Sequence, residues 1–379
     1  MKLKRLNSTA ASSSKFSNKE GFLIIKDYET AITILKDDRF RVPNLHGFIE
    51  RLELATGNSF PSLKRFIHNS PFFLEGKRHQ ELRNISLKYF VPGGLKQWDS
   101  FISKKIDLII ERAMQKNEFD IIESIGLPIF TEICRPMIGL YPLNIKAFDA
   151  KATVLQRLIE PMLSLNNLKR VDQDLGWLLS QIEHPIPTMQ NKSDSVYASL
   201  LSEALDDFSE EDKTAIAITL YAAVAPLSQT ITNILHQLYK DDPDSHKAAV
   251  SCDQFADQME GCLHKAAAPI YIHRIANSDF MIDGFKMNAG NTVMIEIATA
   301  FRGDDESCPV PSGNNIQNFA FGYGKHFCIG SHLSKRIISE LIPKFLNAFP
   351  KLEVIETKAD ANNHIANALA TFTVRRPLI

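Results

Sequence analysis

The feature that most constrains this chain is a cysteine set in a glycine-rich turn just ahead of a helical pattern. Decapeptide 321–330 reads FGYGKHFCIG, with Cys328 between Gly324 and Gly330. Glycine allows tight turns and close approach of the backbone to a flat molecule. Backbone N–H groups at a helix start stabilise a thiolate. A cysteinate in this setting is suited to be an axial ligand of haem iron. The alternative is a buried structural cysteine.

The turn resembles the haem-binding loop of the cytochrome P450 family, F-G-x-G-x-H-x-C-x-G, and fills every fixed position. The resemblance covers about residues 22–377 and implies that Cys328 ligates the iron of haem b. It implies that Phe321 packs beside the sulfur, that Gly322 shapes the turn and that Gly330 lets the next helix lie close under the haem. The implied fold is mainly α with small β-sheets, with haem between a long central helix and the helix after the cysteine loop.

Composition and charge exclude several classes of protein. The 379 residues carry a net charge of −1, which argues against nucleic acid or a membrane surface as the main partner. Five scattered cysteines without paired spacing indicate a reducing cytoplasm. We expect a disordered segment at 1–19 and a single domain at 20–379, acting as a monomer. The apolar stretch 215–227 is too short to span a bilayer.

Hydrophobic periodicity predicts many helices and a few short strands. Helices are expected at 28–36, 97–116, 120–139, 145–165, 168–181, 196–205, 210–239 and 332–349. Strands are expected at 21–27, 270–276, 280–285, 291–297 and 370–375. Segment 40–73 contains three prolines and is expected to be a flexible loop over a pocket.

Four basic side chains occupy positions where the family holds the two haem propionates. Buried carboxylates need cationic or hydrogen-bonding partners. His79 and Arg83 lie at i and i+4, so one helix face presents both. Arg274 ends a segment that resembles the family's strand beside the ring, and His326 precedes Cys328 by two residues. Each alone is more typical of a solvated surface, but together, in this order around a cysteine loop, they predict haem binding.

The central helix of the family carries an acid or amide followed by threonine, which relay protons during oxygen activation. The matching positions here are Gln229 and Thr230, with Thr232 as the fallback. Pro226 and Leu227 replace the small residues usual before them, and a glutamine cannot release a proton at neutral pH. The alternative is that Gln229 and Thr230 only pack or cap within a buried helix.

The resemblance fails at the family's Glu-x-x-Arg pair, which locks the segment before the cysteine loop. Its two positions hold Cys262 and Lys265, which cannot form a bidentate ion pair, and Glu260 is out of phase. The segment that the pair would brace, 302–313, is also short and lacks aromatic residues. We therefore expect a fold that still closes around haem but has a looser loop before Cys328.

These features favour a haem-thiolate monooxygenase that inserts one oxygen atom from O2 into a small, mostly hydrophobic substrate, as in secondary metabolism. No flavin or nicotinamide domain is recognised, so electrons are expected from a ferredoxin and a ferredoxin reductase that uses NAD(P)H. A basic cluster is typical either of a ferredoxin-binding surface or of ordinary surface charge: Lys77, Arg78, Lys88, Lys325, Lys335 and Arg336. The changes at 226, 227 and 229 leave open a peroxygenase, dehydratase, isomerase or cyclase. A non-catalytic haem-binding relative also remains open.

Overall fold

The computed structural model describes residues 16–19, 22–159, 164–182, 195–203, 205, 207–241, 252–282, 284–301, 318–361, 363 and 365–377. This part of the chain is mainly helical with small sheets, which confirms the expected fold class. The α-helices are α1 (Tyr28–Lys36), α2 (Leu45–Thr56), α3 (Pro61–His68), α4 (Gly76–Leu87), α5 (Pro92–Leu95), α6 (Asp99–Met114), α7 (Arg135–Ile138), α8 (Ile145–Ala152), α9 (Leu165–Ser180), α10 (Val196–Ser202), α11 (Glu210–Ala222), α12 (Ala225–Asp241), α13 (Cys252–Ala266) and α14 (Ser331–Ala348). Shorter 3-10 or π turns occupy Lys96–Trp98, Ile122–Gly126, Ile129–Cys134, Thr153–Ile159 and Gly324–His326.

The strands of the described residues form three small sheets. They are β1 (Phe16–Lys19), β2 (Phe22–Ile25), β3 (Phe40–Arg41), β4 (Glu118–Asp120), β5 (Tyr271–Ala276), β6 (Phe280–Ile282), β7 (Phe285–Met287), β8 (Thr292–Glu296), β9 (Glu353–Ala359) and β10 (Leu369–Arg375). The largest sheet has the order β1-β2-β8-β5-β3, the second has β4-β10-β9, and β6 pairs with β7. In the largest sheet β2 and β8 are parallel, whereas β5 pairs antiparallel with β8 and sets Arg274 opposite Val293.

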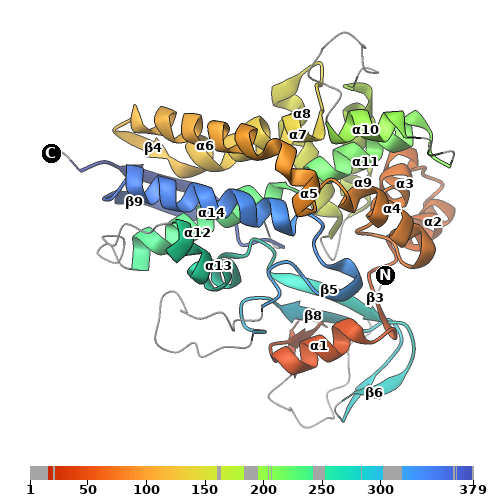
Figure 1. Ribbon diagram of the computed structural model, residues 1–379. Helices are drawn as coiled ribbons and strands as arrows, with labels where there is room; N and C mark the ends of the chain where they lie inside the picture. The colour runs from red at the N-terminus through yellow and green to blue at the C-terminus, as the bar shows by residue number, and fades with distance from the viewer. Residues whose placement is uncertain are drawn as a thin grey trace.

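Two hydrophobic cores meet at the segment that leads to Cys328. The larger core lies among the helices, where α14 packs between α6 on one side and α12 and α13 on the other (Figure 1). The smaller core lies between α1 and the largest sheet and includes Phe319, whose ring stacks on Tyr28 at 5.1 Å between centroids. Ala320 packs against both cores. The cysteine loop is therefore fixed at the junction of the helical and sheet parts.

The central helix is interrupted rather than continuous. The sequence predicts one helix at 210–239, but α11 ends at Ala222 and α12 begins at Ala225. Pro226 lies in the first turn of α12, where a missing N–H costs nothing, so proline starts a helix here instead of bending one. Segment Glu210–Tyr239 is long and apolar enough to cross a membrane, but 67% of its most apolar window is buried inside the fold, as expected of a core helix.

Other sequence-based expectations are wrong in particular segments. The loop expected at 40–73 contains α2 and α3, because Asn44 caps α2 through Gly47 N–H and Pro61 occupies the first turn of α3. Within the expected disordered segment 1–19, residues Phe16–Lys19 pair with β2 as strand β1, and the rest lies outside the described residues. The sequence analysis also missed β9, whose mostly exposed residues lack a buried face.

Candidate functional site

The loop that carries Cys328 is closed by its own backbone. The N–H of Cys328 donates to the carbonyl of Phe321 at 2.8 Å, and the N–H of Gly322 donates to the carbonyl of Phe319 at 2.8 Å. Gly322 and Gly324 have φ of 73° and 70°, in the left-handed region that favours glycine. The backbone conformation alone therefore explains why positions 322 and 324 hold glycine, without any bound group.

Gly330 is different, because its backbone needs no special conformation. Its φ is −82°, and a Cβ added there would meet only the sulfur of Cys328 at 3.9 Å, an ordinary contact. The chain's own atoms therefore leave room for a side chain at this position. A requirement for glycine would have to come from a group bound next to the sulfur.

Cys328 as a residue is exposed, but the surrounding protein desolvates its thiol group. Burial raises the pKa of the Cys328 thiol, while the N–H of Gly330 and the charge of Arg83 lower it, and the net direction is upward. Backbone N–H groups at the helix start do reach the sulfur, as the sequence suggested, but they do not outweigh desolvation. A stable thiolate here would need a bound cation such as a metal ion.

The four predicted basic residues come together beside this loop from three separate segments. The ring of His79, from α4, lies 4.3 Å from the ring of His326, centroid to centroid. Arg83, one turn further along α4, is near enough to Cys328 for their charges to interact. Arg274, from β5, interacts electrostatically with Glu75, and His326 Nε2 lies 3.4 Å from Glu75 Oε1. The structure thus brings these four positions together, and their role as a site stays a prediction.

A cavity of about 230 Å³ opens within this cluster, lined by Glu75, Gly76, His79, Gln80, Arg83, Gly324 and Lys325. His79 is buried, and its Nε2 has no hydrogen-bond partner in the described part of the chain. Burial, followed by the charges of His326 and Arg83, lowers the pKa of His79 to about 4. Arg274 is also buried, and its Nη1 donates to the carbonyl of His273 at 2.8 Å. The site thus presents hydrogen-bond donors of His79 and Arg274 that are shielded from water.

Sequence reasoning missed Glu75, which places a carboxylate among these donors. Its Oε1 accepts from the N–H of Val42 at 3.0 Å and faces His326. Burial acts to raise the pKa of Glu75, but the bonds from His326 and Val42 and the charge of Arg274 bring it down to about 2. The available signal was an acidic residue just before the first turn of α4, where acids usually cap helices. Here its side chain makes no cap bond.

On the central helix, Thr230 and Thr232 face different neighbours. The buried hydroxyl of Thr230 accepts from the N–H of Ala268, 3.1 Å away, in the segment that leads into β5. Thr232 donates to the carbonyl of Gln229 at 2.9 Å, and its methyl lies 2.9 Å from where a Cβ on Gly126 would be. Thr232 therefore packs on Ile122–Gly126, whereas Thr230 is bonded to the segment before β5. Gln229 Oε1 is buried without a hydrogen-bond partner among the residues described.

The six basic residues expected to form a positive surface each contact a carboxylate. Their partners are Glu81 for Lys77 and Arg78, Glu203 for Lys88, Asp38 for Lys325, Glu260 for Lys335, and both Asp99 and Glu340 for Arg336. Pairing leaves little local excess of positive charge. This pairing favours the alternative of ordinary surface charge over a ferredoxin-binding surface.

The first position of the missing Glu-x-x-Arg pair holds a residue that cannot form an ion pair. Cys262 is buried, and burial raises the pKa of its thiol to about 12, so it is uncharged. The short segment 302–313, for which a looser loop is expected, lies outside the described residues. Glu260, judged out of phase from sequence, contacts Lys335 and Asn318.

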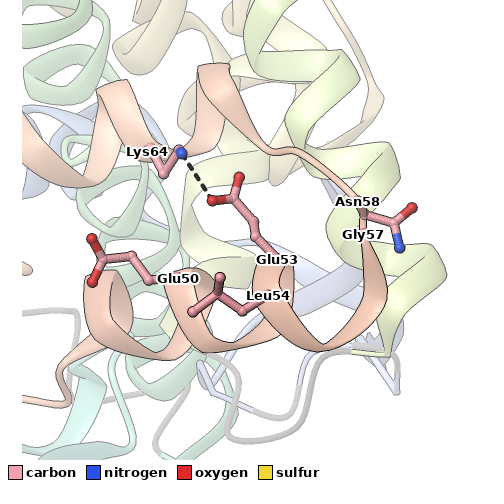
Figure 2. A pocket seen from close by; sticks show the side chains of 6 residues that line it. All are labelled: Glu50, Glu53, Leu54, Gly57, Asn58 and Lys64. Carbon is pink, nitrogen blue, oxygen red and sulfur yellow. Dashed lines mark hydrogen bonds and ion pairs between the residues drawn. The ribbon is translucent and has the colours of Figure 1, made fainter.

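A larger hollow of about 590 Å³ lies on α2 and α3 and shares no lining residue with the His79 cavity. Figure 2 shows Glu50, Glu53 and Leu54 on α2, with Lys64 of α3 paired to Glu53 at 2.9 Å. The hollow is open to solvent, and four of its six lining residues are polar or charged. It contains none of the predicted site residues, so size alone does not identify the functional site.

No protein-family model matches the chain. It is similar to cytochrome P450 YjiB of Bacillus subtilis, with 23% identity over 83% of this chain and 82% of that protein. It is also similar to luteothin monooxygenase of Streptomyces thioluteus (22% identity, covering 84% and 80%) and to cytochrome P450(BM-1) of Priestia megaterium (24%, covering 75% and 72%).

Solved structures share the fold. P450BioI in complex with an acyl carrier protein ligated to hexadec-9Z-enoic acid matches with a TM-score of 0.79 and 20% identity, covering 94% of this chain and 92% of that one. Epothilone B-bound cytochrome P450epoK matches with a TM-score of 0.79 and 15% identity, covering 96% and 94%. These matches show that the fold is the one shared by solved cytochrome P450 structures. The chain is similar to bacterial cytochromes P450 over most of its length, and these relatives include a protein named as a monooxygenase.

Proposed function

We propose that this protein is a haem-thiolate monooxygenase in which Cys328 ligates the iron of haem b. The observation that carries the proposal is the convergence of His79, Arg83, Arg274 and His326 beside the cysteine loop. Arg83 and Arg274 offer two positive charges for two propionates, and the histidines offer further donors. The unpartnered, buried Nε2 of His79 fits such a ligand, because a buried polar atom without a partner is costly.

Phe321, Gly322 and Gly330 are proposed to shape the surface on which the porphyrin rests. Phe321 fixes the backbone of Cys328 through its carbonyl, and the bare Cα of Gly330 leaves room beside the sulfur. Haem, when bound to cysteinate, supplies oxygen activation and insertion of one oxygen atom into the substrate. The protein's part is to bind, orient, exclude water and deliver protons.

Thr230 and Gln229 are proposed to handle protons on the distal side. Because Thr230 Oγ1 accepts from Ala268, its own O–H remains available to donate. Gln229 has no titratable proton, but its buried Oε1 can accept from a water molecule. Proton delivery in this chain would therefore pass through water held between these two side chains, because neither is an acid.

We propose that the substrate is a small, mostly hydrophobic organic molecule and that the enzyme acts in the cytoplasm as a monomer. Electrons would come from a separate ferredoxin, supplied by a ferredoxin reductase that uses NAD(P)H. Since the basic residues near the loop are paired with carboxylates, long-range attraction of an acidic partner would be weak. Reduction by ferredoxin should then depend little on ionic strength. Nucleic acid and membrane are not proposed partners.

A second candidate is a haem-thiolate enzyme that does not use O2 as a monooxygenase, such as a peroxygenase, dehydratase, isomerase or cyclase. The residues at the oxygen-handling positions favour it: Pro226 and Leu227 replace small residues, and residue 229 is not an acid. Product formed with peroxide alone, or with no oxidant, at least as fast as with O2 and electrons would select this candidate. A haem-binding relative without activity would bind the cofactor but turn over under none of these conditions.

The proposed function is tested by titrating the purified apoprotein with haemin. We expect saturation at one haem per chain, and clearly weaker binding for Arg83→Leu and for Arg274→Leu, each of which removes one proposed propionate partner. Lys104→Met, which removes a cation that has no assigned role, is the matched control and should bind like wild type. Saturable uptake that is insensitive to both arginine variants would contradict the proposed site, and no uptake at all would contradict the function.

A further inference from the structure

We propose that Glu260 of α13 is a positioning residue that holds the Cys328 loop by bonding both of its flanks. The idea deepens the proposed function and rests on it, because the loop matters only if its cysteine is a ligand. At the first position of the family's pair, Cys262 carries an uncharged thiol and cannot form an ion pair. Glu260 lies on the same helix and contacts both flanks.

The first flank is the segment that enters the loop. Asn318 Nδ2 donates to the backbone carbonyl of Glu260 at 3.3 Å and to its side-chain Oε2 at 3.2 Å. The other side of the same amide is also used, since Asn318 Oδ1 accepts from the N–H of Ala320 at 2.9 Å. Asn318 therefore transmits the position of α13 to the backbone next to Phe321.

The second flank is α14, the helix that leaves the loop. Lys335 forms an ion pair with Glu260 Oε1, and its Nζ lies 5.7 Å from the centre of the Phe321 ring. A cation at this distance over an aromatic face is attracted to it. The carbonyl of Phe321 in turn accepts from the N–H of Cys328. Contacts thus run without a gap from Glu260 through Lys335 and Phe321 to the cysteine.

The solvent exposure of the pair decides what kind of effect to expect. The side chains of Lys335 and Glu260 are 35% and 36% exposed, so the ion pair is partly screened and contributes little to global stability. The two bonds of the Glu260 carboxylate, to Asn318 and to Lys335, nevertheless restrain a short loop from opposite ends. Loss of Glu260 should loosen the placement of the sulfur while leaving the fold intact.

The test uses the haem-loaded protein and measures haem loss to a scavenging globin together with the absorption band of the ferrous carbon monoxide complex. For Glu260→Ala we expect haem loss on the order of tenfold faster and a band that is split between thiolate-ligated and thiol-ligated forms. Glu260→Gln keeps an acceptor for Asn318 and should lie between Ala and wild type. The double variant Glu260→Lys with Lys335→Glu restores the ion pair in reverse but not the side-chain bond from Asn318, so it should recover part of the loss.

Glu132→Gln is the matched control, because Glu132 pairs with Arg112 at 2.7 Å and is similarly exposed, yet lies on Ile129–Cys134. It should lose haem like wild type. Haem loss and spectra of Glu260→Ala equal to wild type would overturn the role of Glu260 and leave the proposed function standing. Loss that simply follows a lowered unfolding midpoint in urea, without rescue by the reversed pair, would also overturn it. A wild type that takes up no haem would refute the proposed function itself.

Discussion

Replacing Thr230 with valine separates the structural role of this residue from its proposed catalytic one. The side chains have nearly the same shape, but valine has no oxygen to accept from the N–H of Ala268, which is 3.1 Å from Thr230 Oγ1 and buried with it. Leaving a buried donor unpaired costs about 1–3 kcal/mol. Thr230→Ser keeps the oxygen and should stay within about 1 kcal/mol of wild type.

Equilibrium unfolding of the apoprotein in urea measures this difference. We expect a lower midpoint for Thr230→Val with an unchanged slope, because the surface exposed on unfolding is the same. A valine variant as stable as wild type would refute the hydrogen bond and the orientation of Thr230. If Thr230 also handles protons, the folded valine variant should consume reducing equivalents without forming a matching amount of product, whereas the serine variant should couple them.

Three further predictions concern polar side chains of the site and of the core. Glu75→Gln removes a carboxylate that faces His326, lies near Arg274 and would repel the haem propionates. Haem should therefore bind up to about tenfold more tightly, equivalent to about 1.4 kcal/mol. Weaker binding in a haemin titration would contradict this. In the apoprotein, the pKa of His79 is lowered from 6.5 to about 4, so the unfolded state takes up a proton first and stability should fall by about 1–3 kcal/mol as pH drops from 6.5 to 4. Urea midpoints at pH 7 and pH 5 should show this fall, and His79→Gln should reduce it; an equal fall in the variant would assign it to other groups. Asn233→Ala leaves the carbonyls of Ala266 and Asn367 without their donor and should lower the free energy of unfolding in urea by about 2–4 kcal/mol. Asn233→Asp should not restore this stability, because a carboxylate cannot donate. A loss below about 0.5 kcal/mol for the alanine variant would contradict these hydrogen bonds.

Much of the site could be predicted because it depends on local sequence. Gly322 and Gly324 have a left-handed backbone, which few residue types other than glycine favour. The two glycines therefore predict the turn before Cys328 directly from the sequence. His79 and Arg83 are one turn apart on a helix, which fixes their common face. Resemblance to a family then supplied the order of the distant segments, including β5 with Arg274.

What could not be predicted depends on contacts between distant segments. Glu75 meets His326 across 251 residues, and Lys325 meets Asp38 across 287, and nothing local in the sequence signals either pair. Prolines misled the reading of 40–73, since Pro61 starts a helix rather than preventing one. Glu260 was discounted because its spacing did not fit the expected motif, although its side chain reaches both flanks of the loop.

The central claim is that the sulfur of Cys328 binds the haem iron, and the spectrum of the ferrous carbon monoxide complex tests it most directly. We expect a thiolate-type band for the wild-type protein and its complete loss in Cys328→Ala, with the folded structure retained by circular dichroism. The same band in both proteins would show that Cys328 is not the ligand.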